Sequence, residues 1–175
     1  MNSRLIAAGL GALILTAALA SAQTLSLTGS APTLDGVVAA NEYSLSLPVG
    51  KITLSASRTA DTVYLAVSAP TTGWVSVGFG SERMDGADLF LGCVTGGKPS
   101  FTQQIGSEHT HSRLPSPLAV RDALREAGGV TTLETAFKSG DVIGGKKELW
   151  VLVAYGADDS FSSYHLARGS IKLKL

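Results

Sequence analysis

The sequence predicts an all-β protein, an immunoglobulin-like antiparallel β-sandwich with at most one short helix. Three observations lead to this prediction. Short segments rich in β-branched and aromatic residues recur along the chain. Several of them alternate apolar and polar side chains, which is the period of a strand. Glycine, proline, asparagine and aspartate separate these segments, and little of the chain has helical periodicity.

The first 22 residues have the pattern of a secretory signal peptide. Arg4 supplies a positive start, an uncharged apolar run follows over 5–20, and Ala20-Ser21-Ala22 forms a small-residue cleavage site before Gln23. We therefore expect a periplasmic or secreted protein whose single domain spans 23–175. No cysteine lies at the start of the mature chain and no second long apolar run occurs, so we expect neither a lipoprotein anchor nor a membrane span after cleavage.

The strands of the domain can be assigned in order along the chain. Residues 51–57 and 62–67 alternate on either side of a turn at Asp61, which predicts a hairpin. The later expected strands are 74–79, 87–94, 99–105, 130–137, 148–155 and 170–175. Residues 118–127 carry enough Leu, Ala, Arg and Glu to predict a short helix that ends at Gly128-Gly129.

Composition excludes several classes of function. The chain has 14 basic and 14 acidic residues and no basic run, so we expect no nucleic-acid binding. Cys93 is the only cysteine, so no internal disulfide can form, and its apolar surroundings predict burial. There is no C-x-x-C-H for covalent haem and no G-x-S-x-G of a hydrolase. The sequence favours a non-catalytic carrier or binding domain over an enzyme.

Met84 stands out in the loop between the strands at 74–79 and 87–94. Its neighbours in 80–86 are polar, charged or glycine, so strand periodicity does not explain a methionine there. Either the side chain folds back onto the sandwich as an apolar plug, or its thioether binds a ligand.

Two ends of the chain resemble one family. The pattern GW-x(3)-GF-x(4)-M-x-GAD over 73–88 is similar to the signature of DOMON domains, the β-sandwich family that includes the cytochrome domain of cellobiose dehydrogenase. The segment 164–173 resembles the family's closing pattern, in which a histidine, here His165, precedes a glycine by four residues and an alternating last strand follows.

The resemblance implies a b-type cytochrome that carries single electrons. Its haem b would be non-covalent, with Met84 and His165 as the axial iron ligands. In such a cytochrome Arg168, three residues from His165, could pair with a haem propionate, because a guanidinium suits bidentate carboxylate recognition. Trp74 could line the cofactor. The family's domains are fused to a flavin domain or to membrane cytochromes, whereas this chain contains neither. The resemblance therefore implies a separate redox partner, a dehydrogenase or a membrane cytochrome, and we expect a monomer.

Three alternatives stay open. The domain could be a haem-free module for carbohydrates or other small ligands. Trp74 and Trp150 lie in apolar segments, so we expect both in the core, but either could stack on a sugar if it is exposed. The domain could bind copper through His109 and His111, which face the same way if their segment is extended, with Met84 as a third ligand. A lysine, Lys146 or Lys147, could replace His165 as haem ligand, as in related sandwiches of molybdenum dehydrogenases.

Overall fold

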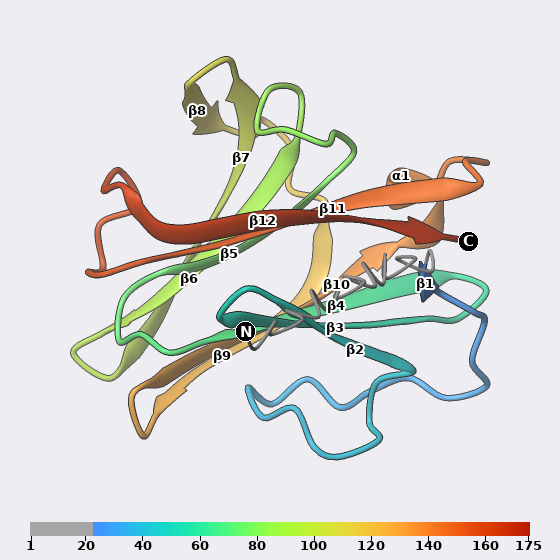
Figure 1. Ribbon diagram of the computed structural model, residues 1–175, viewed down its shortest axis with the longest axis horizontal. Coiled ribbons are helices and arrows are strands. Elements are labelled where there is room, and N and C mark those ends of the chain that lie inside the picture. Colours follow the sequence, from blue (N-terminus) through green and yellow to red (C-terminus); the bar gives the residue numbers. More distant parts are fainter. Residues whose placement is uncertain (1–22) are drawn as a thin grey trace, which may run out of the picture.

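The computed structural model describes residues 23–175 as two β-sheets stacked face to face (Figure 1). The expected signal peptide, 1–22, lies outside the described residues. The predicted β-sandwich is confirmed, and α1 (Ser139–Val142) is the only helix in 23–175. No helix within this range is long and apolar enough to cross a membrane.

The larger sheet has seven strands and carries both ends of the DOMON-like pattern. In spatial order its strands are β1 (Gln23–Thr24), β12 (His165–Lys174), β11 (Glu148–Gly156), β5 (Val75–Phe79), β6 (Asp88–Thr95), β7 (Lys98–Ser107) and β8 (Thr110–Arg113). Neighbours are antiparallel except β1 and β12, which run parallel.

The smaller sheet has five strands. Its order is β2 (Leu45–Val49), β3 (Ile52–Arg58), β4 (Thr62–Ala69), β10 (Val130–Lys138) and β9 (Ala119–Ala127). All of its pairings are antiparallel. The hairpin predicted over 51–57 and 62–67 is confirmed as β3–β4.

The helix predicted over 118–127 is wrong, because this segment forms strand β9. Gly128 and Gly129 have φ of 61° and 77°, the left-handed geometry of a two-residue hairpin turn. They return β9 onto β10, where Leu124 faces Leu133 and packs against the core. Hairpin pairing and burial of Leu124 thus outweigh helix-forming composition.

The core lies between the sheets, but each sheet is also covered on its outer face. Phe79 and Phe90 each make a T-shaped contact with Phe137 in the middle, with centroid distances of 4.9 and 6.1 Å. A second buried cluster lies on the outer face of the larger sheet, and a third, around Tyr43 and Tyr64, lies on the outer face of the smaller one. As a result, β4, β6 and β10 are buried on both faces.

Candidate cofactor site on the outer face of the larger sheet

The outer face of the larger sheet has a floor of small and apolar side chains. Residues opposite one another on neighbouring strands share a face, so the strand registers define two rows across it. The first row is Arg168, Ala154, Ser76, Leu91 and Thr102, and the second is Ser170, Leu152, Gly78, Leu89 and Gln104. The central positions on β5 and β11 are mostly small, so a flat group could approach the backbone closely there.

Met84 lies at one end of this floor, in the loop between β5 and β6. It is half-buried and packs against the second cluster, which consists of Trp74, Ala87, Leu89, Leu91 and Cys93. Backbone hydrogen bonds hold the loop over β7, since Gly86 N donates to Gly106 O at 3.0 Å and Gly106 N donates to Ala87 O at 2.9 Å. In this conformation the methionine packs as an apolar side chain on the outer face of the larger sheet.

His111 is the histidine that the structure places beside Met84. A Cβ on Gly106 would lie 1.8 Å from the Met84 carbonyl oxygen and 3.1 Å from its Cγ, so Met84 lies directly over Gly106. His111 is the cross-strand partner of Gly106 and therefore shares this face. Its Nδ1 contacts the side-chain amide oxygen of Gln104, also on this face. His109, by contrast, lies exposed in the turn between β7 and β8 and is not in one extended segment with His111.

His165 lies at the other end of the floor. It is the first residue of β12, is half-buried, and pairs with Gly156 at an irregularity in the β11–β12 register. Its neighbours Tyr164 and Leu166 are 92% and 63% exposed. Arg168 is exposed and lies opposite Ala154, so it projects from the same face as the floor.

Trp74 positions the loop that leads to His165. Its side chain is only 5% exposed, and its Nε1 donates to Ser163 Oγ at 2.9 Å. It is therefore buried as expected and offers no open surface for a sugar. Trp150 is only half-buried, with the Lys172 ammonium 5.0 Å from its ring centroid, so the core placement expected for it is wrong. Cys93 is buried as predicted, and burial raises the pKa of its thiol.

The close approach of Trp74 to β11 gives a stability prediction. A Cβ on Gly156 would lie 2.1 Å from the indole Nε1, so Gly156→Ala must displace the ring from Ser163. We expect a loss of about 1–3 kcal/mol in the free energy of unfolding, measured by urea denaturation. Gly140→Ala is the control, since a Cβ there meets nothing within 4 Å. Equal effects of the two substitutions would contradict this role of Gly156.

Met84 and His165 do not meet in this conformation. Met84 lies over β7, whereas His165 is on β12, and β6, β5 and β11 lie between these strands. Four inter-strand spacings amount to about 19 Å. Two side chains cannot reach one iron atom across that separation unless the loop at 80–86 moves towards β12.

The alternative lysines, Lys146 and Lys147, lie just before β11 begins, whereas His165 lies beside the residue at which β11 ends. Lys147 O accepts a hydrogen bond from Leu175 N just before β11 begins. Lys146 is close enough to Asp88 to oppose the rise in pKa that burial causes in that carboxyl. Within 23–175, no group of three or more His, Cys, Asp or Glu side chains could hold a metal ion.

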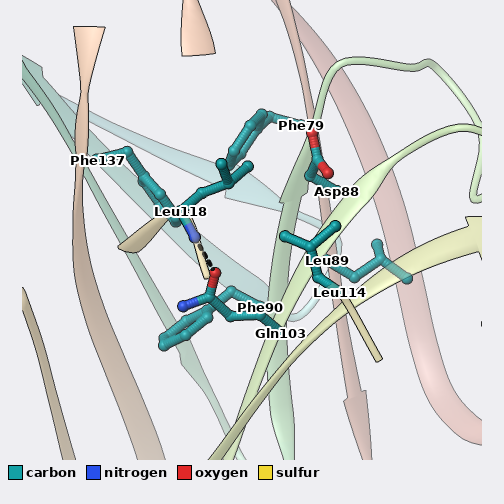
Figure 2. Close-up of a pocket in the computed structure, with 8 residues that line it drawn as sticks. All are labelled: Phe79, Asp88, Leu89, Phe90, Gln103, Leu114, Leu118 and Phe137. Atoms are coloured by element: carbon teal, nitrogen blue, oxygen red, sulfur yellow. Dashed lines mark hydrogen bonds between the residues drawn. The ribbon is translucent and has the colours of Figure 1, made fainter. Parts of the chain in front are cut away.

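One cavity lies beside the start of β6. Figure 2 shows the cavity beside Asp88 and Leu118, where Gln103 Oε1 accepts a hydrogen bond from Leu118 N at 2.6 Å. Its volume is about 10 Å³, at most enough for a single water. This cavity therefore cannot hold a haem or a sugar.

Comparison with solved structures identifies the class of fold. No protein-family model matches the sequence, and no curated protein matches it significantly. The cytochrome b domain of pyranose dehydrogenase from Coprinopsis cinerea is similar, with a TM-score of 0.55 over 70% of this chain and 76% of that one, at 12% identity. The cytochrome domain of cellobiose dehydrogenase from Myriococcum thermophilum gives 0.54 over 75% and 81%, at 10% identity. Both are DOMON-type cytochrome domains, so the fold implied by the sequence resemblance is confirmed.

Proposed function

We propose that the protein is an exported electron carrier that binds haem b on the outer face of the larger sheet, with Met84 and His165 as axial ligands. The observation that carries this proposal is the shared fold with two cytochrome b domains, combined with a methionine and a histidine at the two ends of one apolar face. When bound, the haem would supply a one-electron Fe(III)/Fe(II) couple. A thioether and an imidazole stabilise the ferrous state and leave no open coordination position.

The residues present fit the group in chemistry, but ligation by both requires movement of the loop at 80–86. Gly80 and Gly86 flank the loop with φ of 96° and 73°, backbone conformations that glycine adopts without strain. Moving it would release the hydrogen bonds to Gly106 O and from Glu108 N to Asp85 Oδ1, the latter 2.8 Å long. Arg168 lies on the same face and could pair with a propionate. Trp74 holds the segment that precedes His165 through its hydrogen bond to Ser163.

The partner we propose is a separate redox protein, a dehydrogenase or a membrane cytochrome, that meets the domain where His165 reaches the surface. Tyr164 and Leu166 expose large apolar area beside this histidine. A small contact of this type suits transient electron-transfer encounters between monomers. Export to a periplasm or to the medium would follow from the leader at 1–22.

A second candidate function, copper binding, is favoured by one specific observation. Met84 lies over Gly106 on β7, and His111 on β8 is the cross-strand partner of Gly106, without any movement of the loop. A thioether with an imidazole is a donor pair suited to copper. In this candidate His109 plays no part, because it lies in the exposed turn.

Visible spectra of four variants test the proposal. We expect the protein exported with haem supplied to show a sharp Soret band and, after dithionite, resolved α and β bands of a six-coordinate haem. Met84→Leu and His165→Gln should each abolish this low-spin spectrum, while the control His109→Gln leaves it intact. If His111→Gln rather than His165→Gln abolishes the low-spin spectrum, the second haem ligand is His111 on β8. A folded but colourless protein would overturn the cytochrome proposal and turn attention to copper and carbohydrate titrations.

A further inference from the structure

A groove at one end of the smaller sheet lies outside the site described above. It is formed where β3 ends and where the chain passes from β10 through α1 towards β11 (Figure 1). Its volume is about 450 Å³, within the range of small-molecule sites. The residues that line it are Leu27, Arg58, Thr59, Ala60, Ser139, Gly140, Ile143, Gly144 and Gly145.

Arg58 gives the groove a positive charge with no partner in the described chain. Its backbone is fixed, because Arg58 O accepts hydrogen bonds from Thr28 N at 2.8 Å and from Thr28 Oγ1 at 3.1 Å. Its Nε is buried and has no hydrogen-bond partner among residues 23–175. Arg58 also forms no ion pair within this range, where the only one joins Lys172 to Glu148. Buried donors of this kind are normally satisfied, and a guanidinium binds carboxylates in a bidentate manner.

Ser139 supplies a second unused polar group on the same groove. Its hydroxyl oxygen is also buried and lacks a partner within the described residues. A hydroxyl can donate to an anion or accept from a neutral group, so it complements the guanidinium. The adjacent Gly144 and Gly145, with φ of 52° and 78°, leave backbone accessible on this wall.

The remaining wall is apolar. Leu27 is 62% exposed although it lies beside Arg58 in a parallel bridge, and Ile143 and Ala60 complete this side. Neighbouring acids do not line the groove. Asp61 and Asp141 adjoin it in sequence, both are exposed, and neither pairs with Arg58. The groove therefore has a cationic end beside an apolar wall, which suits an amphipathic ligand with an anionic group and an apolar body.

We propose that this groove binds a small monocarboxylate with an apolar body, its carboxylate on Arg58 and Ser139 and its chain against Leu27 and Ile143. The site is separate from the haem face, so it does not depend on the proposed electron-transfer function. It gives the domain a ligand-binding activity of its own.

Titration with sodium hexanoate tests the proposal. In ¹H–¹⁵N spectra of the purified protein, we expect saturable shifts of the Arg58 Nε–H signal and of the Gly144 and Gly145 amides. Hexanol, which has a similar chain and no charge, should bind at least about tenfold more weakly, since a charge-assisted hydrogen bond is lost. Hexanol binding as tightly as hexanoate would overturn the role of Arg58.

Variants separate a specific site from general surface attraction. Arg58→Met retains most of the apolar stem and should weaken hexanoate binding at least about tenfold with the fold intact by circular dichroism. Arg121→Met, on the exposed part of β9, is the matched control and should have no effect. If Arg58→Met fails to fold, Ser139→Ala serves instead, with weaker binding expected. Absence of a saturable shift, or equal binding by the Arg58 and Arg121 variants, would refute the site.

Discussion

Replacement of Glu134 by alanine is expected to lower the free energy of unfolding by about 3 kcal/mol or more. This carboxylate is completely buried on the outer face of the smaller sheet. It accepts hydrogen bonds from Tyr43 Oη at 2.7 Å, Gly36 N at 2.7 Å and Asp35 N at 3.0 Å. Truncation would leave three donors unsatisfied and release the segment that covers this face. Urea denaturation measures the loss, and Glu126→Ala on β9 serves as control.

The same residue gives a pH dependence. Burial raises the pKa of the Glu134 carboxyl above its ordinary value of 4.5, and the hydrogen bond from Tyr43 offsets only part of the rise. The folded state therefore holds this proton to higher pH than the unfolded state. Its contribution to stability is present below pH 4.5 and is lost as the pH rises through the raised pKa.

Glu134→Gln isolates this contribution. The amide preserves the shape of the side chain but does not titrate, so the variant's free energy of unfolding should fall less steeply than that of the wild type above pH 4.5. Denaturation at a series of pH values compares the two slopes. Parallel curves would show that Glu134 has the same pKa in both states, contrary to its burial.

Glu134 also shows what strand periodicity cannot reveal. The alternation over 130–137 predicts β10, but a carboxylate in an apolar strand gives no sign of its partner when that partner lies more than 90 residues away. The donors to this carboxylate come from Asp35, Gly36 and Tyr43, near the start of the domain. Only the fold shows that hydrogen bonds to Glu134 hold the Asp35-Gly36 turn and Tyr43 against the smaller sheet.

The elements that sequence analysis missed have local physical causes. Strand β9 was expected as a helix from its composition, although Gly128-Gly129 between two segments is itself a hairpin signal. Strand β8 was hidden by the polar composition of 106–113, because an edge strand gains its stability from pairing with β7 rather than from burial.

The candidate site was predictable residue by residue but not as an arrangement. Motifs single out Met84 and His165, yet their relation depends on the strand order from β7 to β12, which no local pattern encodes. The same order brings His111 to Met84 through Gly106, a glycine that sequence analysis did not single out.

Substitution of Gly106 by alanine should therefore distinguish the two metal-binding arrangements. The new Cβ would lie 1.8 Å from the Met84 carbonyl oxygen and 2.7 Å from its carbonyl carbon. Backbone atoms cannot avoid such a clash by changing rotamer, so the loop at 80–86 must lift from β7. We expect a loss of about 1–3 kcal/mol in the apoprotein and at least about tenfold weaker copper binding by Met84 and His111.

Haem binding through Met84 and His165 should respond in the opposite way, because that pair already requires the loop to leave β7. The low-spin spectrum should persist in Gly106→Ala, and haem affinity should be unchanged or higher, since the competing position of the loop has been destabilised. Gly29→Ala is the control, as a Cβ there meets nothing within 4 Å. A folded Gly106→Ala protein that loses the low-spin spectrum would mean that Met84 ligates iron from its place over β7, with His111 as the nearest imidazole to share it.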